Sequence, residues 1–178
     1  LMDEWDVRVY ALTEYDYPGY KFVKSWDDVN GDGLIHLSSA SFGAHSVPSG
    51  QTLPDGYVQQ NTSANCSDTS HNHISPDRVV DASTGLLPDT TWYFDGQAHE
   101  QTIWNGVIVT LLCKILLDDE ITDVYSDPRY PQFMCGRNTK KMNAIIAEAT
   151  AFLRNVGGGI APADREAVET ALAGAERA

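Results

Sequence analysis

Segments that could form β-strands are few in this chain and lie far apart. Residues 6–12 alternate apolar and polar side chains, and residues 91–94, Thr-Trp-Tyr-Phe, are β-favouring and mostly aromatic. Residues 20–26 are expected to form a further extended segment. Because two or three strands cannot bury a sheet by themselves, we expect another polypeptide segment to supply the rest of the sheet.

Two further regions before residue 118 are predicted from their residue patterns. Residues 102–117 are apolar on nearly every side of a helix, which predicts a buried helix that contains Cys113 as a buried thiol. Residues 43–90 are dominated by Ser, Thr, Asn, Gly, Pro and Asp without a sustained periodicity. Such a composition predicts a loop-rich insertion.

The last part of the chain, residues 118–178, is predicted to form a loop followed by two helices. Apolar side chains recur at helical spacing over 142–156, and Gly157 follows them as a helix-ending residue. Pro162 then opens an Ala-rich segment with acidic residues in its first turn. The chain is thus divided into two parts, before and after residue 118.

Charge and hydropathy argue against two classes of partner. The 178 residues include 12 basic and 25 acidic side chains, a net charge of −13, whereas a nucleic-acid backbone requires clustered Lys and Arg. The longest apolar run, 103–117, contains Asn105 and Lys114 and is shorter than the ~20 residues that span a bilayer. We therefore expect no nucleic-acid partner and no transmembrane segment.

The cysteines and two sequence triplets bear on the compartment of the protein. An odd number of cysteines allows at most one internal disulfide bond in a chain with 3 of them, and Cys66 and Cys135 are candidates for it. Asn61-Thr-Ser and Asn65-Cys-Ser fit the acceptor pattern for N-glycosylation, which has meaning only in a secreted protein. These features favour an extracellular or lumenal protein.

The acidic loop that begins at Asp28 has two interpretations. In the first, Asp28, Asn30 and Asp32 stand at positions one, three and five of a calcium loop of the EF-hand type. Position twelve, which should be a bidentate acid, is Ser39, so this loop lacks an important ligand. A calcium-binding module is therefore an alternative, as is a non-catalytic interaction domain.

In the second interpretation, Asp32 works together with a histidine. Asp32 lies in Asn30-Gly-Asp-Gly, downstream of the first predicted strand, and His99 lies in Gly96-Gln-Ala-His, directly after the strand at 91–94. A carboxylate that accepts the Nδ1–H of a histidine fixes its tautomer and stabilises the imidazolium that forms during acyl transfer. The two segments therefore predict an acid–base pair.

These segments resemble the C-terminal part of the lecithin:cholesterol-acyltransferase-like lipases and esterases, which have the α/β-hydrolase fold. Asp32, followed by Ser39-Ala40, is similar to the acid segment of that family, and His99 is similar to its base. The acid precedes the histidine, as it does in this fold. The resemblance covers about residues 6–117. It implies an α/β fold, here the C-terminal portion of an α/β-hydrolase sheet with additional C-terminal helices.

The resemblance also implies an activity. Asp32 and His99 would be catalytic residues of a Ser-His-Asp triad in a carboxylic ester hydrolase that acts on lipid-like or other hydrophobic esters. The chain contains no Gly-x-Ser-x-Gly motif. The nucleophile is therefore expected on an N-terminal portion of the same hydrolase, which is the expected partner of this chain. Alone, the chain should not catalyse acyl transfer.

A metal site in the loop-rich insertion is the weaker interpretation of its polar side chains. The candidate ligands would be Cys66, His71, His73, Asp77 and Asp81. Cys-x4-His-x-His is not a typical zinc spacing, so we expect the two histidines to form local hydrogen bonds. The sequence therefore predicts no metal ion and no cofactor.

Overall fold

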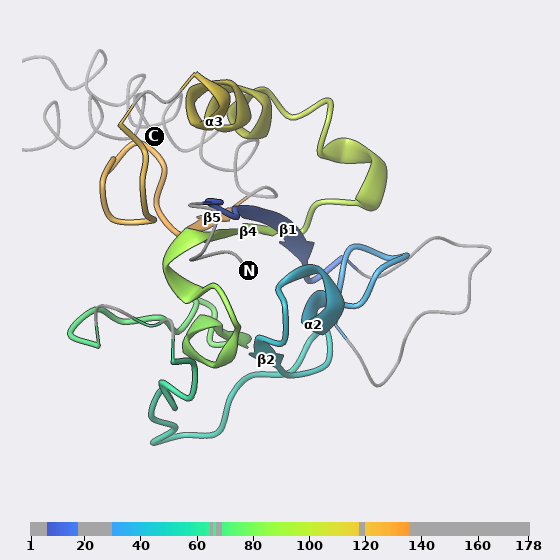
Figure 1. Ribbon diagram of the computed structural model, residues 1–178. Helices are drawn as coiled ribbons and strands as arrows, with labels where there is room; N and C mark the ends of the chain where they lie inside the picture. The colour runs from blue at the N-terminus through green and yellow to red at the C-terminus, as the bar shows by residue number, and fades with distance from the viewer. Residues whose placement is uncertain (1–6, 18–29, 65, 67–68, 118–119, 136–178) are drawn as a thin grey trace, which may run out of the picture. The chain divides into compact units, whose positions relative to one another are not determined.

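The structure, a computed structural model, describes residues 7–17, 30–64, 66, 69–117 and 120–135. Within these residues, three parallel strands form one sheet in the order β1-β4-β5, and two antiparallel strands form a second, small sheet (Figure 1). The strands are β1 (Ala11–Tyr15), β2 (His45–Ser46), β3 (Val80–Asp81), β4 (Thr91–Asp95) and β5 (Phe133–Cys135). The helices are α2 (Leu37–Ala40) and α3 (Gly106–Leu116), and 3₁₀ turns span Ala82–Thr84, Pro88–Thr90 and His99–Gln101. This mixed content with a parallel sheet confirms the α/β class.

Strands β1 and β4 pair in parallel, so their carboxyl ends lie at the same edge of the sheet. The register runs from Ala11 opposite Thr91 to Tyr15 opposite Asp95. The strand predicted over 6–12 therefore begins and ends later than its side-chain alternation indicates. The difference arises because only residues that face a partner strand can complete the ladder of hydrogen bonds.

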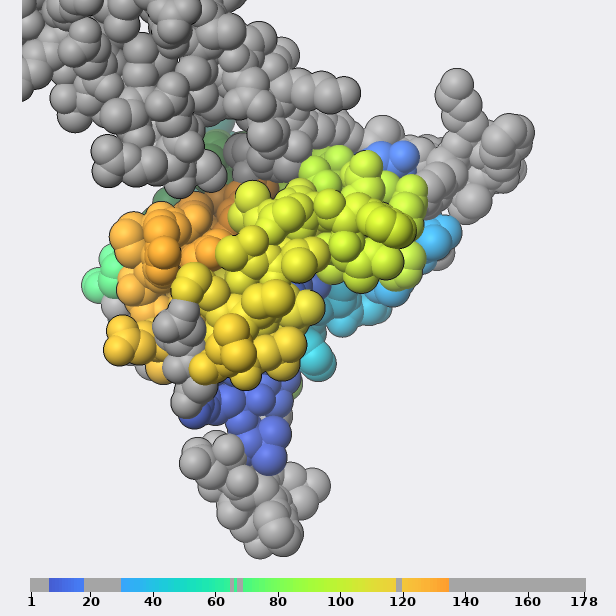
Figure 2. Space-filling view, turned by 90° about the horizontal axis from the view of Figure 1, so that it is seen from above, coloured from blue at the N-terminus to red at the C-terminus, as the bar shows by residue number. Residues whose placement is uncertain are grey.

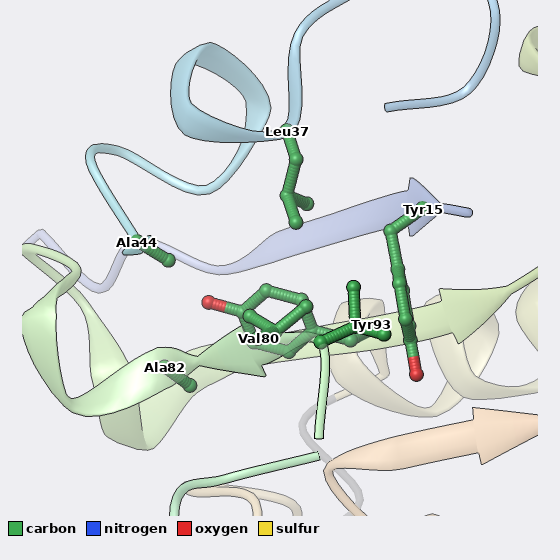
Figure 3. Packing of buried hydrophobic residues seen from close by; sticks show 7 residues of the cluster. Tyr15, Leu37, Ala44, Val80, Ala82 and Tyr93 are labelled. Carbon is green, nitrogen blue, oxygen red and sulfur yellow. The ribbon is translucent and has the colours of Figure 1, made fainter. Parts of the chain in front are cut away.

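The sheet buries a different set of side chains on each face. On the face towards α2 and the small sheet, Tyr15 and Tyr93 pack edge to face, with ring centroids 6.4 Å apart. Leu37 of α2 and Val80 of β3 cover the same two rings (Figure 3). The loop-rich segment 43–90 thus contributes to the hydrophobic core through its few apolar residues.

The opposite face of the sheet carries Trp92 and Phe94, the neighbours of Tyr93 in β4. Ile108 and Leu111 of α3 belong to the same buried cluster, and Figure 1 shows α3 on that side of the strands. Alternate residues of β4 therefore point to opposite faces, and both faces are buried, as is typical of strands in parallel sheets. The strand predicted in this region is confirmed.

Helix α3 differs from its prediction in both length and burial. It begins only at Gly106, because the side-chain oxygen of Asn105 accepts hydrogen bonds from the amides of its first turn. Of its residues, all of which the structure describes, only Ile108 and Leu111 are buried. Cys113 is exposed, so its prediction as a buried thiol is wrong. An apolar pattern does not reveal which faces of a helix have neighbours.

The outer side of α3 is apolar and exposed. Figure 2 looks onto this side of the molecule, with α3 in yellow. The exposed apolar residues of the helix and its flanks are Ile103, Trp104, Val107, Val109, Leu112, Leu116 and Leu117. An apolar surface of this extent is typical of an interaction site.

The second predicted part of the chain, 118–178, is described only as far as residue 135. The loop predicted at its start contains β5, which pairs with β4. The two helices predicted beyond it, and the extended segment predicted over 20–26, lie outside the described residues. No helix in the described part of the chain is both long and apolar enough to cross a membrane.

Candidate active site

A tight loop between β1 and α2 holds Asp32. A Cβ atom at Gly31 would lie 2.0 Å from the carbonyl oxygen of Ile35, so this position requires glycine. Gly33 adopts a φ of +94°, which glycine tolerates without strain. The two glycines flanking the acid in the sequence motif are therefore explained by the shape of the loop.

The Asp32 carboxylate is buried and each of its oxygens has its own partners. The residue is 3% exposed. Its Oδ1 accepts hydrogen bonds from the backbone N–H of Leu34 at 2.8 Å and of Ile35 at 2.7 Å. Its Oδ2 lies 2.7 Å from Nδ1 of His99. The two amides fix the carboxylate so that Oδ2 faces the imidazole.

His99 follows β4 and is the first residue of the 3₁₀ turn His99–Gln101. Its backbone N–H donates to the carbonyl oxygen of Asp32 at 3.0 Å, which links the two loops a second time. Its side chain is 43% exposed, and Nε2 makes no hydrogen bond to any residue that the structure describes. Because the neutral ring donates its Nδ1–H to Asp32, Nε2 carries a lone pair that can accept a proton.

Both residues that the sequence predicts for the site are thus brought together by the sheet. Asp32 lies after β1 and His99 after β4, and the parallel pairing of these strands places the following loops at one edge. The arrangement can orient an imidazole and stabilise its protonated form.

Glu14, in β1, is a third ionisable residue near this pair that sequence reasoning missed. It is buried, and it accepts a hydrogen bond from the Thr102 hydroxyl. Burial raises the pKa of Glu14; the hydrogen bond from Thr102 opposes this effect, and the nearby Asp32 carboxylate adds to it. The sequence did not reveal Glu14, because the predicted strand, 6–12, ended before it and its burial is a property of the fold.

The oxygens that the alternative calcium interpretation uses have other partners. Oδ1 of Asn30 accepts a hydrogen bond from the backbone N–H of Asp16 at 2.7 Å, and its Nδ2 donates to the carbonyl oxygen of Val47 at 3.0 Å. Both oxygens of Asp32 are engaged by amides and by the imidazole. Asp28 lies outside the described residues. Calcium would have to displace these hydrogen bonds, so the geometry favours the acid–base pair.

Two carboxylates of the other metal interpretation stabilise the loop-rich segment instead. Asp77 accepts hydrogen bonds from the Ser75 hydroxyl and the Tyr15 hydroxyl. Asp81 accepts hydrogen bonds from the backbone N–H of Ser83 at 3.1 Å and the Tyr57 hydroxyl at 2.9 Å. Asp81 is fully buried, whereas Asp77 is exposed. Carboxylates that accept from several donors in this way hold loops in place.

The cysteine and the histidines of the same metal interpretation contact one another or an aromatic ring. His71 stacks on Tyr125, with ring centroids 3.8 Å apart. Sγ of Cys66 lies 3.5 Å from Nε2 of His73. Cys66 is a thiol, so it does not form the disulfide bond considered with Cys135.

Comparison with known proteins finds no family model that matches the chain, no similar curated protein and no similar solved structure. A function for this chain must therefore follow from its own residues and their geometry.

Proposed function

We propose that this chain supplies the acid and the base of a Ser-His-Asp triad in a carboxylic ester hydrolase of the α/β-hydrolase type. The observation that carries the proposal is the 2.7 Å hydrogen bond between Oδ2 of Asp32 and Nδ1 of His99. It joins loops at the carboxyl ends of neighbouring parallel strands, the edge at which open α/β sheets bind their ligands. The resemblance to lecithin:cholesterol-acyltransferase-like lipases and esterases supports the same chemistry.

In this mechanism, His99 acts first as a general base and then as a general acid. Its Nε2 takes the proton of the serine hydroxyl as that oxygen attacks the ester carbonyl, and then delivers the proton to the leaving alcohol. Asp32 accepts the Nδ1–H throughout and stabilises the imidazolium that exists between the two transfers. Water then attacks the acyl-enzyme with help from the same base, which releases the acid and regenerates the serine.

The serine nucleophile is proposed to lie on an N-terminal portion of the same hydrolase, outside this chain. None of the 178 residues belongs to a Gly-x-Ser-x-Gly motif, the strand-to-helix turn that presents the serine in this fold. Two surfaces of the described residues support a larger domain. In the described sheet β1 is an edge strand, and the outer side of α3 is apolar and exposed. Further strands and helices of the hydrolase would cover both.

Lipid-like or other hydrophobic esters are the proposed substrates. Ile103 and Trp104 follow His99 closely in the chain and are 71% and 78% exposed. Large apolar side chains near a base favour a substrate with an apolar acyl chain, because ligand sites are lined mainly by such groups. On this basis we propose a role in lipid metabolism.

The proposal is tested by the turnover of p-nitrophenyl esters by the complete hydrolase. Asp32→Asn and His99→Ala are each expected to lower kcat by about 10⁴-fold without a change in the circular dichroism spectrum, because both disable the triad base. His45→Ala is a matched control at an exposed histidine of β2 and should retain full activity. If Asp32→Asn or His99→Ala turns over the esters at the wild-type rate, the proposal is contradicted. A longer reading frame without any Gly-x-Ser-x-Gly would favour a non-catalytic interaction domain.

A further inference from the structure

We propose that Cys66, His73 and Asp89 bind a zinc ion at the amino end of β4. All three side chains come from the loop-rich insertion, 43–90, and Asp89 lies at its end, in the 3₁₀ turn Pro88–Thr90 directly before the strand. One potential ligand atom from each of them lies within 4.8 Å of the others. This inference is independent of the proposed ester hydrolysis.

The distances between the donor atoms suit a tetrahedral zinc ion. Sγ of Cys66 lies 3.5 Å from Nε2 of His73, and that nitrogen lies 3.9 Å from Oδ1 of Asp89. Zinc bonds of about 2.3 Å to sulfur and about 2.0 Å to nitrogen place two tetrahedral ligands roughly 3.5 Å apart. The sulfur and the nitrogen already have this separation, and the carboxylate oxygen lies about half an ångström farther from the nitrogen than this.

The hydrogen bonds of Gln132 determine which nitrogen of His73 is available to a metal. Nε2 of Gln132 donates to the carbonyl oxygens of Pro88 at 2.6 Å and Thr91 at 3.3 Å, which fixes the orientation of the side-chain amide. Its Oε1 then lies 3.1 Å from Nδ1 of His73 and can only accept a hydrogen bond from it. The proton of the neutral ring is therefore on Nδ1, and the lone pair is on Nε2.

This is the arrangement that metal-binding histidines show. Their second nitrogen donates to a carbonyl or carboxylate oxygen, which fixes the tautomer and the orientation of the ring. The Tyr125 hydroxyl also lies near His73, 3.0 Å from Nδ1 and 3.1 Å from Nε2. Because it is almost equidistant from both nitrogens, it lies off the lone-pair axis of Nε2.

Burial and donor type favour zinc over calcium or magnesium. The side chain of His73 is fully buried and that of Asp89 is 12% exposed. A thiolate and an imidazole are ligands for zinc, whereas calcium and magnesium prefer oxygen alone. Binding releases the thiol proton of Cys66 to solvent, because the thiolate is the ligand. Three protein ligands leave the fourth position to a water molecule.

The site lies at the opposite end of β4 from the acid–base pair. Asp89 precedes β4 and His99 follows it, and a five-residue strand is roughly 16 Å long. The proposed zinc ion therefore does not contact the acid–base pair. It would instead connect Cys66 and His73 of the loop-rich insertion to the start of a central strand.

The test is metal binding by the full chain after treatment with a chelator. Zinc titration with detection by mass spectrometry of the metal is expected to give a single zinc ion per chain and a raised Tm. Cobalt in place of zinc should give a thiolate-to-cobalt charge-transfer band. Cys66→Ser should remove this band and lower zinc affinity by at least about 100-fold, because it removes a ligand. The exposed Cys113→Ser is the matched control and should change neither.

A second variant separates loss of the metal site from loss of the fold. Gln132→Ala keeps all three ligands and should lower zinc affinity by about 10- to 100-fold, because it releases the ring of His73. The proposal is overturned if the wild-type chain binds no zinc, if the cobalt form lacks the thiolate band, or if Cys66→Ser binds zinc as tightly as the wild-type chain. These readouts require neither ester hydrolysis nor a stable His73 variant.

Discussion

At the scale of single residues, the orientation of the Asp32 carboxylate depends on Gly31, which has no side chain that could contact it. Gly31 lets the carbonyl of Ile35 approach closely, and the same turn directs the N–H groups of Leu34 and Ile35 at Oδ1 of Asp32. The remaining oxygen is left for His99. Backbone shape therefore determines which oxygen acts on the imidazole.

Glu14 leads to a prediction about stability and pH. Its pKa is raised, chiefly by burial, so its stabilising contribution is complete below the ordinary value of 4.5 and is lost as the pH rises through the raised value. In Glu14→Gln the buried group cannot ionise. The Tm of this variant relative to the wild-type chain should therefore rise as the pH increases above 4.5, as followed by thermal unfolding.

The control for this prediction is Glu100→Gln, which removes an exposed acid from the turn that contains His99. Its Tm should follow the wild-type pH profile. If the Tm of Glu14→Gln also follows the wild-type pH profile at all pH values, burial does not disfavour the ionised form of Glu14.

At the scale of elements, the start of α3 depends on one side chain. Oδ1 of Asn105 accepts hydrogen bonds from the N–H groups of Val107 at 3.0 Å and Ile108 at 3.4 Å. Asn105→Ala should lower the free energy of unfolding by about 1 kcal/mol, because these amides lose their cap. Urea denaturation of the full chain measures this. Thr110→Ala, on an exposed position of the same helix, should not destabilise it, and an equal loss in both variants would argue against the cap.

The strands and α3 also show which features of an element its local sequence pattern predicts. The strand at 91–94 is predicted correctly, since its aromatic residues pack on both faces of the sheet. The first strand is displaced from 6–12 to Ala11–Tyr15, because its register depends on contacts with β4. The burial of α3 is likewise overestimated, because its outer side has no described neighbour that buries it.

At the scale of the whole molecule, the proposed triad is divided between this chain and a further segment. The isolated chain should therefore not hydrolyse p-nitrophenyl esters above the level of its own His99→Ala variant. Activity should appear when an N-terminal portion that carries the serine is added to the wild-type chain but not to the variant. Ester turnover by the isolated chain that His99→Ala abolishes would place the nucleophile within these residues.

The sequence by itself determined the two loops of the candidate site, because glycine next to Asp32 and the Gly-x-x-His segment before α3 are local patterns that specify local backbone. Only the tertiary structure brought Asp32 to 2.7 Å from His99, since their separation depends on the parallel register of β1 and β4. The same is true of the cluster formed by Cys66, His73 and Asp89. Its members have no recognisable spacing, because they meet only through the packing of the loop-rich insertion around the start of one strand.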